Sequence, residues 1–345
     1  MSRKILVTRF SAMGDVAMLV PVLKNVLEQN PYVQITLVTR GFFRPFFKNI
    51  ERLSFLEVDL EGKHQGILGL YKLAQMLKKE KFDAYADLHN VLRTQILRVF
   101  LHFSISEIIS VNKGRKEKKA LTRKRNKIFN PLKTTFERYA EVFRLLGIEV
   151  NLKRTLIQIK KTLPLVLQEK INFDTTKKHI GVAPFAQHEG KMYPFERIQN
   201  SIKKLAQNSE LQLYLFGGGE KEKKLLENIE KQVTNAISLV GKTTLEEELQ
   251  IIRSLDVMVS MDSANMHMAS LVGTPVISFW GATHPHAGFM GFGQSNENSI
   301  QRDDLSCRPC SVYGNKSCWR KDWACLDLDE QIFVRKVNEF LTKID

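Results

Sequence analysis

A carboxylate stands where the first predicted strand gives way to the first predicted helix. The apolar run Lys4–Phe10 is typical of a buried strand, and the loop that follows it ends in Gly14 and Asp15. In an open α/β sheet such loops face the ligand cleft, so Asp15 can present its carboxylate there. The loop lacks GxGxxG and a Walker lysine, which excludes the standard dinucleotide and P-loop fingerprints. Helix capping by Asp15 is the alternative, and the residues alone favour it.

Two further loops carry residues suited to a ribose or to a phosphate. Gly217-Gly218-Gly219 directly follows a predicted strand, so a ligand can approach the backbone there, and Glu220 suits a pair of ribose hydroxyls. Lys191 stands in a polar loop after the predicted strand 179–184 and can neutralise a phosphate. A flexible turn and a solvated lysine are the alternatives at these two positions.

The sequence Asp262-Ser263-Ala264-Asn265-Met266-His267 joins a predicted strand to a helix of small residues. The first N–H groups of such a helix and its positive dipole end bind anions, and the Ser263 hydroxyl adds a donor. His267 lies one turn along the same helix. The alternative makes Ser263 a simple helix cap and His267 a buried core imidazole. The small, uncharged residues that follow favour a ligand site.

All four cysteines lie in one window near the C-terminus: Cys307, Cys310, Cys318 and Cys325. The C-x2-C pair with two further thiols is compatible with a structural zinc site, although the second pair lacks that spacing. Reduced thiols or adventitious disulfides are the alternative. Four cysteines in 345 residues are too few for a disulfide scaffold.

The positive charge of the chain is concentrated in one segment. Lys and Arg number 52 against 37 Asp and Glu, which gives +15. Nine basic residues against one glutamate in residues 113–127 supply +8 of this charge. The excess over the whole chain indicates an anionic partner: nucleic acid, an acidic membrane surface or a phosphorylated substrate. A basic run is usually a solvated face, but at this density it attracts anionic lipid or polyphosphate. The sequence contains no signal-peptide or membrane-spanning pattern, so we expect a cytoplasmic protein.

Short apolar runs alternate with amphipathic stretches, which indicates parallel sheets covered by helices. The alternation stops in the irregular stretch 151–178 and then restarts. We therefore expect two doubly wound α/β domains, at 1–165 and 176–328, the second carrying the cysteine-rich segment 307–325. Residues 329–345 are expected to form a last helix.

Together these motifs resemble those of glycosyltransferase family 9, the ADP-heptose:lipopolysaccharide heptosyltransferases. Residues 9–16 resemble the opening signature of the family, 191–194 its lysine–aromatic–proline element, and 216–220 its glycine–acid loop. Residues 262–267 match its Asp-Ser/Thr-Gly-x-x-His donor motif, except that Ala264 replaces the usual glycine. The motifs occur in the family's order over nearly the whole chain.

The resemblance implies a GT-B fold, in which two Rossmann-like domains face a cleft. The C-terminal helix 329–345 would cross back to pack on the N-terminal domain. The implied activity is an inverting, metal-independent transfer of heptose or a related sugar from an ADP-sugar, with no cofactor required. Asp15 would be the general base. The acceptor would be the Kdo-containing inner core of lipid A.

The resemblance also implies site residues and partners. The donor-binding residues would be Lys191, Gly217, Gly218, Glu220, Asp262, Ser263, Ala264 and His267. The acceptor-binding residues would be Arg9, Ser11, Asn90, Arg93, Arg115, Arg123 and Arg125. We expect a nucleotide-sugar donor, an anionic glycolipid acceptor and peripheral association with the inner membrane, and no nucleic acid. Two alternatives stay open: a basic nucleic-acid-binding protein with a four-cysteine zinc knuckle, and a nucleotide-sugar-binding protein without transferase activity.

Overall fold

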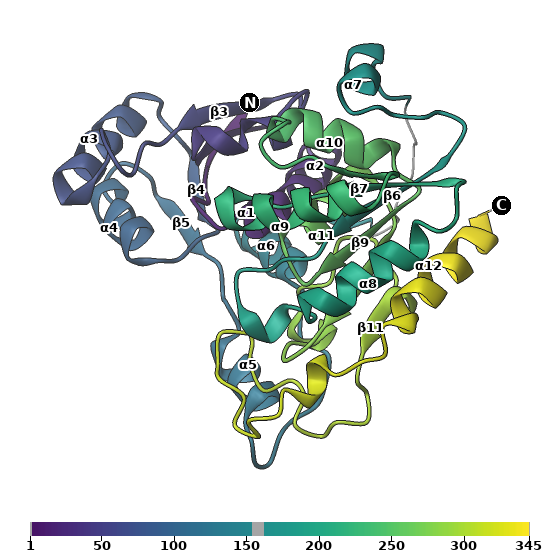
Figure 1. Cartoon of the computed structure of the whole chain (residues 1–345). Coiled ribbons are helices and arrows are strands. Elements are labelled where there is room, and N and C mark those ends of the chain that lie inside the picture. The colour runs from purple at the N-terminus through teal and green to yellow at the C-terminus, as the bar shows by residue number, and fades with distance from the viewer. Residues whose placement is uncertain (1, 154–161, 345) are drawn as a thin grey trace. The chain divides into compact units, whose positions relative to one another are not determined.

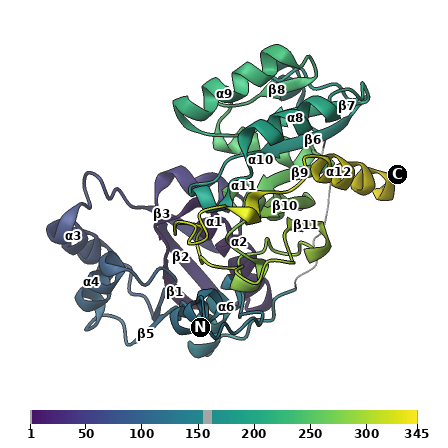
Figure 2. The same cartoon turned by 60° about the horizontal axis from the view of Figure 1, so that its bottom comes forward.

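The chain folds into two compact units. The computed structural model describes residues 2–153 and 162–344. Unit 1 comprises residues 1–113 and 133–154, and unit 2 comprises residues 114–132 and 155–345. Each unit contains one parallel sheet with helices packed around it (Figures 1 and 2), which confirms the predicted α/β class.

The sheet of unit 1 has its first strand at the centre. The strands are β1 (Arg3–Thr8), β2 (Val33–Thr39), β3 (Leu53–Glu57), β4 (Ala84–Asp87) and β5 (Glu107–Ser110). Their order is β3-β2-β1-β4-β5, and all neighbours are parallel. The strands β2 and β3 extend the sheet on one side of β1, and β4 and β5 extend it on the other side. The strand order therefore reverses between β1 and β4, where Thr8 pairs with Asp87. Ligands of open α/β sheets bind at such a switch point.

The helices of unit 1 follow the predicted alternation with one break. They are α1 (Met13–Ala17), α2 (Leu19–Gln29), α3 (Gly66–Lys79), α4 (Leu92–Leu101) and α6 (Thr135–Leu145), with a 3-10 segment η1 (Gly41–Phe47). The sequence predicts one helix over 16–29, whereas the structure has a break at Met18. Pro21 explains the break, because proline has no N–H to donate to the Ala17 carbonyl and its ring crowds that carbonyl.

The sheet of unit 2 repeats this plan. Its strands are β6 (Lys178–Ala183), β7 (Leu211–Leu215), β8 (Ala236–Ser238), β9 (Val257–Met261), β10 (Val276–Trp280) and β11 (Ser299–Gln301). Their order is β11-β10-β9-β6-β7-β8, again with parallel neighbours. The order reverses between β6 and β9, where Ala183 pairs with Ser260. The carboxyl ends of β6, β7 and β9 therefore lie side by side.

The helices of unit 2 connect these strands. They are α7 (Leu165–Lys170), α8 (Phe195–Leu205), α9 (Gly219–Gln232), α10 (Leu245–Ser254), α11 (Ala264–Val272) and α12 (Gln331–Ile344). Short 3-10 turns are η2 (Glu189–Lys191), η3 (Pro285–Ala287), η4 (Asn296–Asn298) and η5 (Ala324–Leu326). Among the described residues of both units, no helix combines the length and apolarity needed to cross a bilayer.

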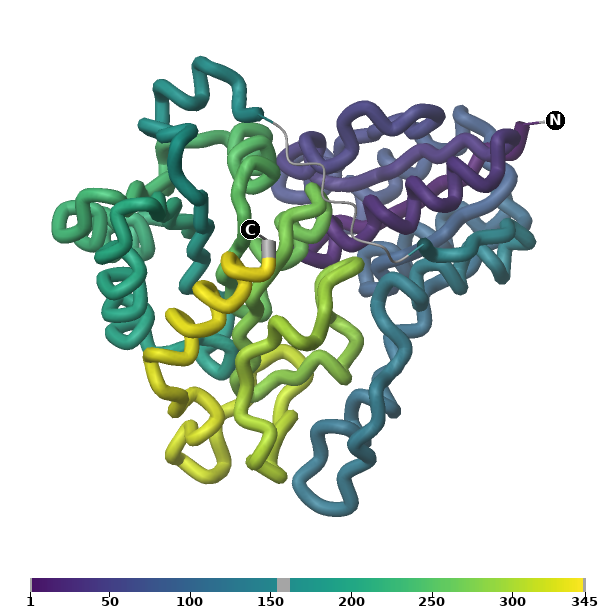
Figure 3. Tube along the Cα trace, turned by 90° about the vertical axis from the view of Figure 1, so that its right-hand side faces the viewer, coloured from purple at the N-terminus to yellow at the C-terminus, as the bar shows by residue number. Residues whose placement is uncertain are grey.

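The basic segment 114–132 belongs to unit 2, although the residues before and after it belong to unit 1. It begins with α5 (Arg115–Thr122), and its path can be followed in Figure 3. The Phe129 ring packs against the imidazoles of His284 and His286, with centroids 5.0 and 4.7 Å away. The Lys127 ammonium donates to the carbonyls of residues 306–308. We expected this segment inside a continuous first domain, 1–165, and these contacts correct that assignment.

The C-terminal helix α12 packs on the core of unit 2, and its expected packing on the N-terminal domain stays a prediction. Its buried side chains Phe333, Val337 and Leu341 recur every four residues and so form one apolar stripe. The stripe joins the core beside α8, and the Phe333 ring lies 5.2 Å from that of Tyr193. The core of unit 2 therefore accounts for the apolar face of this helix.

Candidate active site

Asp15 lies in the first turn of α1 and pairs with Arg9. Its Oδ2 atom is 2.7 Å from an Arg9 guanidinium nitrogen, and the carboxylate stays 30% exposed. Arg9 is buried and held in place, because another of its nitrogens donates to the Leu88 carbonyl at 2.8 Å. The Ala12 amide lies 3.5 Å from the same carboxylate, so this helix-capping hydrogen bond is weaker than the contact with Arg9. An oriented, solvent-accessible carboxylate can accept a proton from a bound hydroxyl.

A buried histidine adjoins this pair. Nδ1 of His89 accepts from the Phe10 amide at 3.4 Å, and the two rings meet edge-on. Burial, reinforced by the charge of Arg9, lowers the pKa of His89 from 6.5 to about 3, so the ring is neutral near pH 7. Sequence reasoning did not select His89, although it directly precedes Asn90, which is expected to bind the acceptor. Ser11, expected to bind the acceptor, is half-buried in the same loop before α1.

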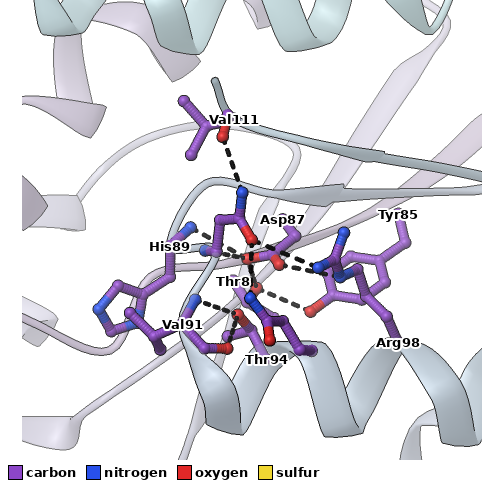
Figure 4. A network of polar contacts seen from close by, with 10 residues as sticks. Thr8, Tyr85, Asp87, His89, Val91, Thr94, Arg98 and Val111 are labelled. Atoms are coloured by element: carbon purple, nitrogen blue, oxygen red, sulfur yellow. Dashed lines mark hydrogen bonds and ion pairs between the residues drawn. The ribbon is translucent and has the colours of Figure 1, made fainter. Parts of the chain in front are cut away.

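Asp87 organises the loop that follows β4 (Figure 4). Its buried carboxylate accepts from the backbone amides of His89 and Asn90, at 3.0 and 2.8 Å. A guanidinium nitrogen of Arg98 on α4 lies 3.3 Å from the other carboxylate oxygen. The Thr8 hydroxyl also donates to the Asp87 carboxylate, at 3.4 Å. This network fixes the backbone at the switch point of unit 1, next to the Asp15 loop.

The residues expected to bind the acceptor are divided between the two units. Arg9, Ser11, Asn90 and Arg93 lie in unit 1, and Arg115, Arg123 and Arg125 lie in unit 2. Asn90 stabilises the fold locally. Its side-chain amide donates to the Val111 carbonyl at 3.0 Å and so joins the ends of β4 and β5. The four arginines at 93, 115, 123 and 125 are exposed. Their guanidinium groups are accessible to an anionic ligand.

Lys191 and Asp262 meet at the switch point of unit 2. Lys191 ends η2 in the loop after β6, and Asp262 follows β9. The ammonium lies 3.0 Å from a carboxylate oxygen of the buried aspartate. Backbone packing fixes the turn, because a side chain at Gly190 would come within 2.7 Å of the Gly314 carbonyl oxygen. The ion pair therefore has a defined place at the sheet edge.

The N-terminus of α11 lies directly after this pair. Ser263 is the N-cap residue, but its hydroxyl lies 3.2 Å from that of Ser260 and makes no capping bond to α11. Ser263 and Ala264 are half-buried, and His267 is buried one turn along. Ala264 is the first helical residue, a backbone position that alanine adopts readily. The first amides of α11 and the dipole suit a diphosphate.

The glycine loop after β7 is shaped by a glutamate that the sequence reasoning missed. Glu222 accepts from the Gly218 amide at 2.7 Å, and its carboxylate lies 3.0 Å from where a Cβ at Gly217 would stand. Gly219 has a φ of 76°, which favours glycine. Glu220 is exposed at the start of α9 and does not take part in this contact. Its carboxylate is accessible to a ligand.

The three loops of unit 2 leave adjacent strands in the order β9, β6 and β7. They bring Ser263, Lys191 and Glu220 to one carboxyl edge of the sheet. An open α/β sheet binds its ligand at this edge. A helix N-terminus, an ammonium and an exposed carboxylate together match the phosphates and the ribose of a nucleotide.

The four cysteines of the C-terminal segment are free thiols. Burial raises the pKa of Cys310, and it raises the pKa of Cys325 to about 12, which favours the protonated thiols. In the part of the chain that the structure describes, no three Cys, His, Asp or Glu side chains are grouped as metal ligands. The structural zinc site stays a prediction, which metal analysis of the purified protein would test.

The sequence model of glycosyltransferase family 9 (heptosyltransferase) matches residues 70–319. The chain belongs to this family. It is 23% identical to lipopolysaccharide heptosyltransferase 1 of Campylobacter coli over 300 residues, which are 81% of this chain and 84% of that protein. The fold is shared with a family 9 glycosyltransferase of Veillonella parvula (TM-score 0.75, 17% identity, 99% and 98% of the two chains). It is also shared with ADP-heptose lipopolysaccharide heptosyltransferase II of Escherichia coli (TM-score 0.71, 17% identity, 99% of each chain).

This family 9 protein is therefore a glycosyltransferase with the predicted GT-B fold. The matched span contains the loops after β4, β6, β7 and β9, and Asp15 lies before its first residue. Family membership does not favour the alternative of a basic nucleic-acid-binding protein.

Proposed function

We propose that this glycosyltransferase transfers heptose from ADP-heptose to the Kdo-containing inner core of lipid A, with inversion. The observation that carries the proposal is the convergence of Lys191, Glu220 and Ser263 on one sheet edge inside the family 9 span. The names of the similar proteins support the substrates: one is a lipopolysaccharide heptosyltransferase, and another uses ADP-heptose by name.

The donor would bind at the carboxyl edge of the sheet in unit 2. The first amides of α11, the Ser263 hydroxyl and the Lys191 ammonium would hold the diphosphate, and Glu220 would accept from the ribose hydroxyls. Asp262 keeps the ammonium in place at 3.0 Å. Fixed donors of this kind stabilise the charge that develops on a departing diphosphate, so no metal ion is required.

Asp15 would act as the general base. The acceptor oxygen attacks the anomeric carbon of the heptose while the bond from that carbon to the β-phosphate oxygen breaks. The acceptor proton passes to the Asp15 carboxylate, and the electron pair leaves with ADP. Arg9 orients the carboxylate through the 2.7 Å contact, and the exposed part of the carboxylate is available to the acceptor.

The acceptor would be held by arginines, because its Kdo carboxylates and lipid A phosphates are anionic. Arg115, Arg123 and Arg125 of the basic segment are exposed and suit these groups, and Arg93 adds a charge in unit 1. The same basic segment would draw the protein to the anionic inner face of the membrane as a peripheral protein.

Two measurements test the proposal. ADP-heptose should raise the melting temperature more than GDP-, UDP- or CMP-sugars do, because binding to the folded state alone stabilises it. With a Kdo-containing lipid A acceptor, one heptose should be transferred for each ADP released. Donor binding without transfer to any inner-core acceptor would make the chain a nucleotide-sugar-binding protein, and preference for another nucleotide sugar would exclude ADP-heptose.

A further inference from the structure

Two neighbouring helices of unit 1 expose a continuous apolar face, and we propose that this face docks on an anionic phospholipid bilayer. The α3–α4 face consists of Ile67, Leu68, Tyr71, Leu92, Val99 and Phe103. All six side chains are exposed to solvent. Exposed apolar side chains that are grouped on one surface, unlike single scattered ones, indicate a contact site.

The helix α4 is apolar on two opposite sides. One side, with Leu97 and Leu101, is buried in the core of unit 1. The other side carries Leu92 and Val99, which are two turns apart, and Phe103 follows one turn later, just past the end of the helix. Val99 and Phe103 are 70% and 97% exposed. Packing within the chain explains the first side only, so the second side requires an external partner.

The helix α3 extends the same face. The Tyr71 ring meets the Phe100 ring of α4 edge-on at 5.6 Å, which joins the two helices at the surface. Leu68, one turn before Lys72, is 78% exposed. Figures 1 and 2 both show α3 and α4 lying side by side, in agreement with their direct packing. The exposed residues of the two helices therefore form one surface.

The charge around the face selects the partner. The helices α3 and α4 contain three lysines and two arginines, and no aspartate or glutamate. Arg98 pairs with Asp87, so Lys72, Lys78, Lys79 and Arg93 supply the positive charge of the face. Exposed aliphatic and aromatic side chains with basic neighbours are the pattern of a helix that lies in the interface of an anionic membrane. A second copy of the chain would bring like charges together at this face, which disfavours self-association.

This inference deepens the proposed function, because the proposed acceptor is a membrane glycolipid. It concerns a different surface from the basic segment of unit 2, and it can be tested without donor or acceptor. Vesicle binding and sugar transfer are separate measurements, so one can fail while the other succeeds.

The test is cosedimentation of the full chain with vesicles of phosphatidylethanolamine and phosphatidylglycerol, compared with vesicles of phosphatidylcholine alone. We expect preference for the anionic vesicles, and the variant Leu68→Ser/Val99→Ser/Phe103→Ser should bind them about tenfold less, because three side chains can no longer enter the interface. The matched control is Leu145→Ser/Leu165→Ser/Val166→Ser, whose side chains are 64%, 73% and 76% exposed elsewhere on the chain. This control should bind like the unchanged protein.

A second variant protects the test against misfolding. Lys72→Glu/Lys79→Glu changes only exposed lysines of α3 and should also weaken binding to the anionic vesicles.

Equal binding by the triple-serine variant and the unchanged protein overturns the proposal. A dimer that dissociates only in the triple-serine variant also overturns it, in favour of self-association. Transfer to a lipid-free inner-core acceptor should be unchanged in that variant. Absence of transfer by the unchanged protein contradicts the proposed function and leaves the vesicle result standing.

Discussion

The ammonium of Lys191 lies 3.0 Å from the carboxylate of Asp262, although the two residues are far apart in the sequence. They meet because β6 and β9 are neighbours and both loops leave the same edge of the sheet. Asp262 is almost completely buried, so Lys191 neutralises a charge that would otherwise be buried without a counter-ion. The pair thereby holds an ammonium beside the first turn of α11.

Removal of Lys191 should destabilise unit 2. Lys191→Met leaves the buried Asp262 carboxylate uncompensated, and we expect the free energy of unfolding to fall by about 3–5 kcal/mol. The double variant Lys191→Met/Asp262→Asn should recover part of this loss, which denaturant unfolding would measure. Lys221→Met, at an exposed lysine of α9, should change stability by less than about 0.5 kcal/mol. Equal instability of the single and double variants would show that the two charges are not coupled.

Loss of the Asp15 carboxylate should stop turnover while sparing the donor site. Asp15→Asn keeps the shape of the side chain but cannot accept the acceptor proton, so kcat should fall by about 10²–10⁴-fold. ADP affinity should stay the same, because the proposed donor residues lie in unit 2. Glu28→Gln, at an exposed carboxylate of α2, is the matched control. Near-normal turnover by Asp15→Asn would remove Asp15 as the base.

Much of the site follows from local sequence. The apolar runs locate the strands, and parallel strands place the loops that follow them at one edge, so Asp262, Lys191 and the glycine loop are predicted to share an edge of the sheet. The split between α1 and α2 also has a local cause, in Pro21. Such features depend on residues within a few positions of one another, and a single sequence displays them.

The contacts that differed from expectation are made between segments distant in the chain. Nothing in residues 114–132 indicates that Lys127 donates to carbonyls at 306–308 or that Phe129 packs on His286. Positive charge is tolerated on the surface of either unit. The charge pattern therefore does not indicate to which unit the basic segment belongs. The stripe of α12 likewise predicts burial but does not say in which core. Glu222 was missed for a different, local reason: Glu220 is two residues away and equally plausible by spacing.

Acid should destabilise the fold through its buried histidines. Burial lowers the folded-state pKa of His89 to about 3, and the pKa of His284 to about 3 as well. Below pH 6.5 the unfolded chain takes up these protons while the folded chain does not. The stabilisation is therefore complete above about pH 6.5 and is lost as the pH falls toward 3. Between pH 7 and pH 5 each histidine should lower the free energy of unfolding by about 2 kcal/mol.

His89→Gln tests this dependence, because glutamine can accept from the Phe10 amide but does not titrate. The loss of stability between pH 7 and pH 5 should shrink by about 2 kcal/mol in this variant, as measured by denaturant unfolding at both pH values. His102→Gln, at an exposed histidine, should leave the pH dependence unchanged. An unaltered slope in His89→Gln would mean that His89 titrates normally in the folded protein.

Two adjacent glycines should respond differently to alanine. Gly219 has a φ of 76°, which an alanine adopts only with strain, so Gly219→Ala should cost about 1–2 kcal/mol of stability. Gly218 has a φ of −149°, and a Cβ there meets no atom within 4 Å. Gly218→Ala should therefore be tolerated by the fold and serves as the matched control.

If Gly218 approaches the donor as proposed, the Gly218→Ala variant should bind ADP more weakly at nearly unchanged melting temperature, because the added methyl group occupies the space that the ligand needs. Unchanged ADP affinity in Gly218→Ala would place the nucleotide away from this loop.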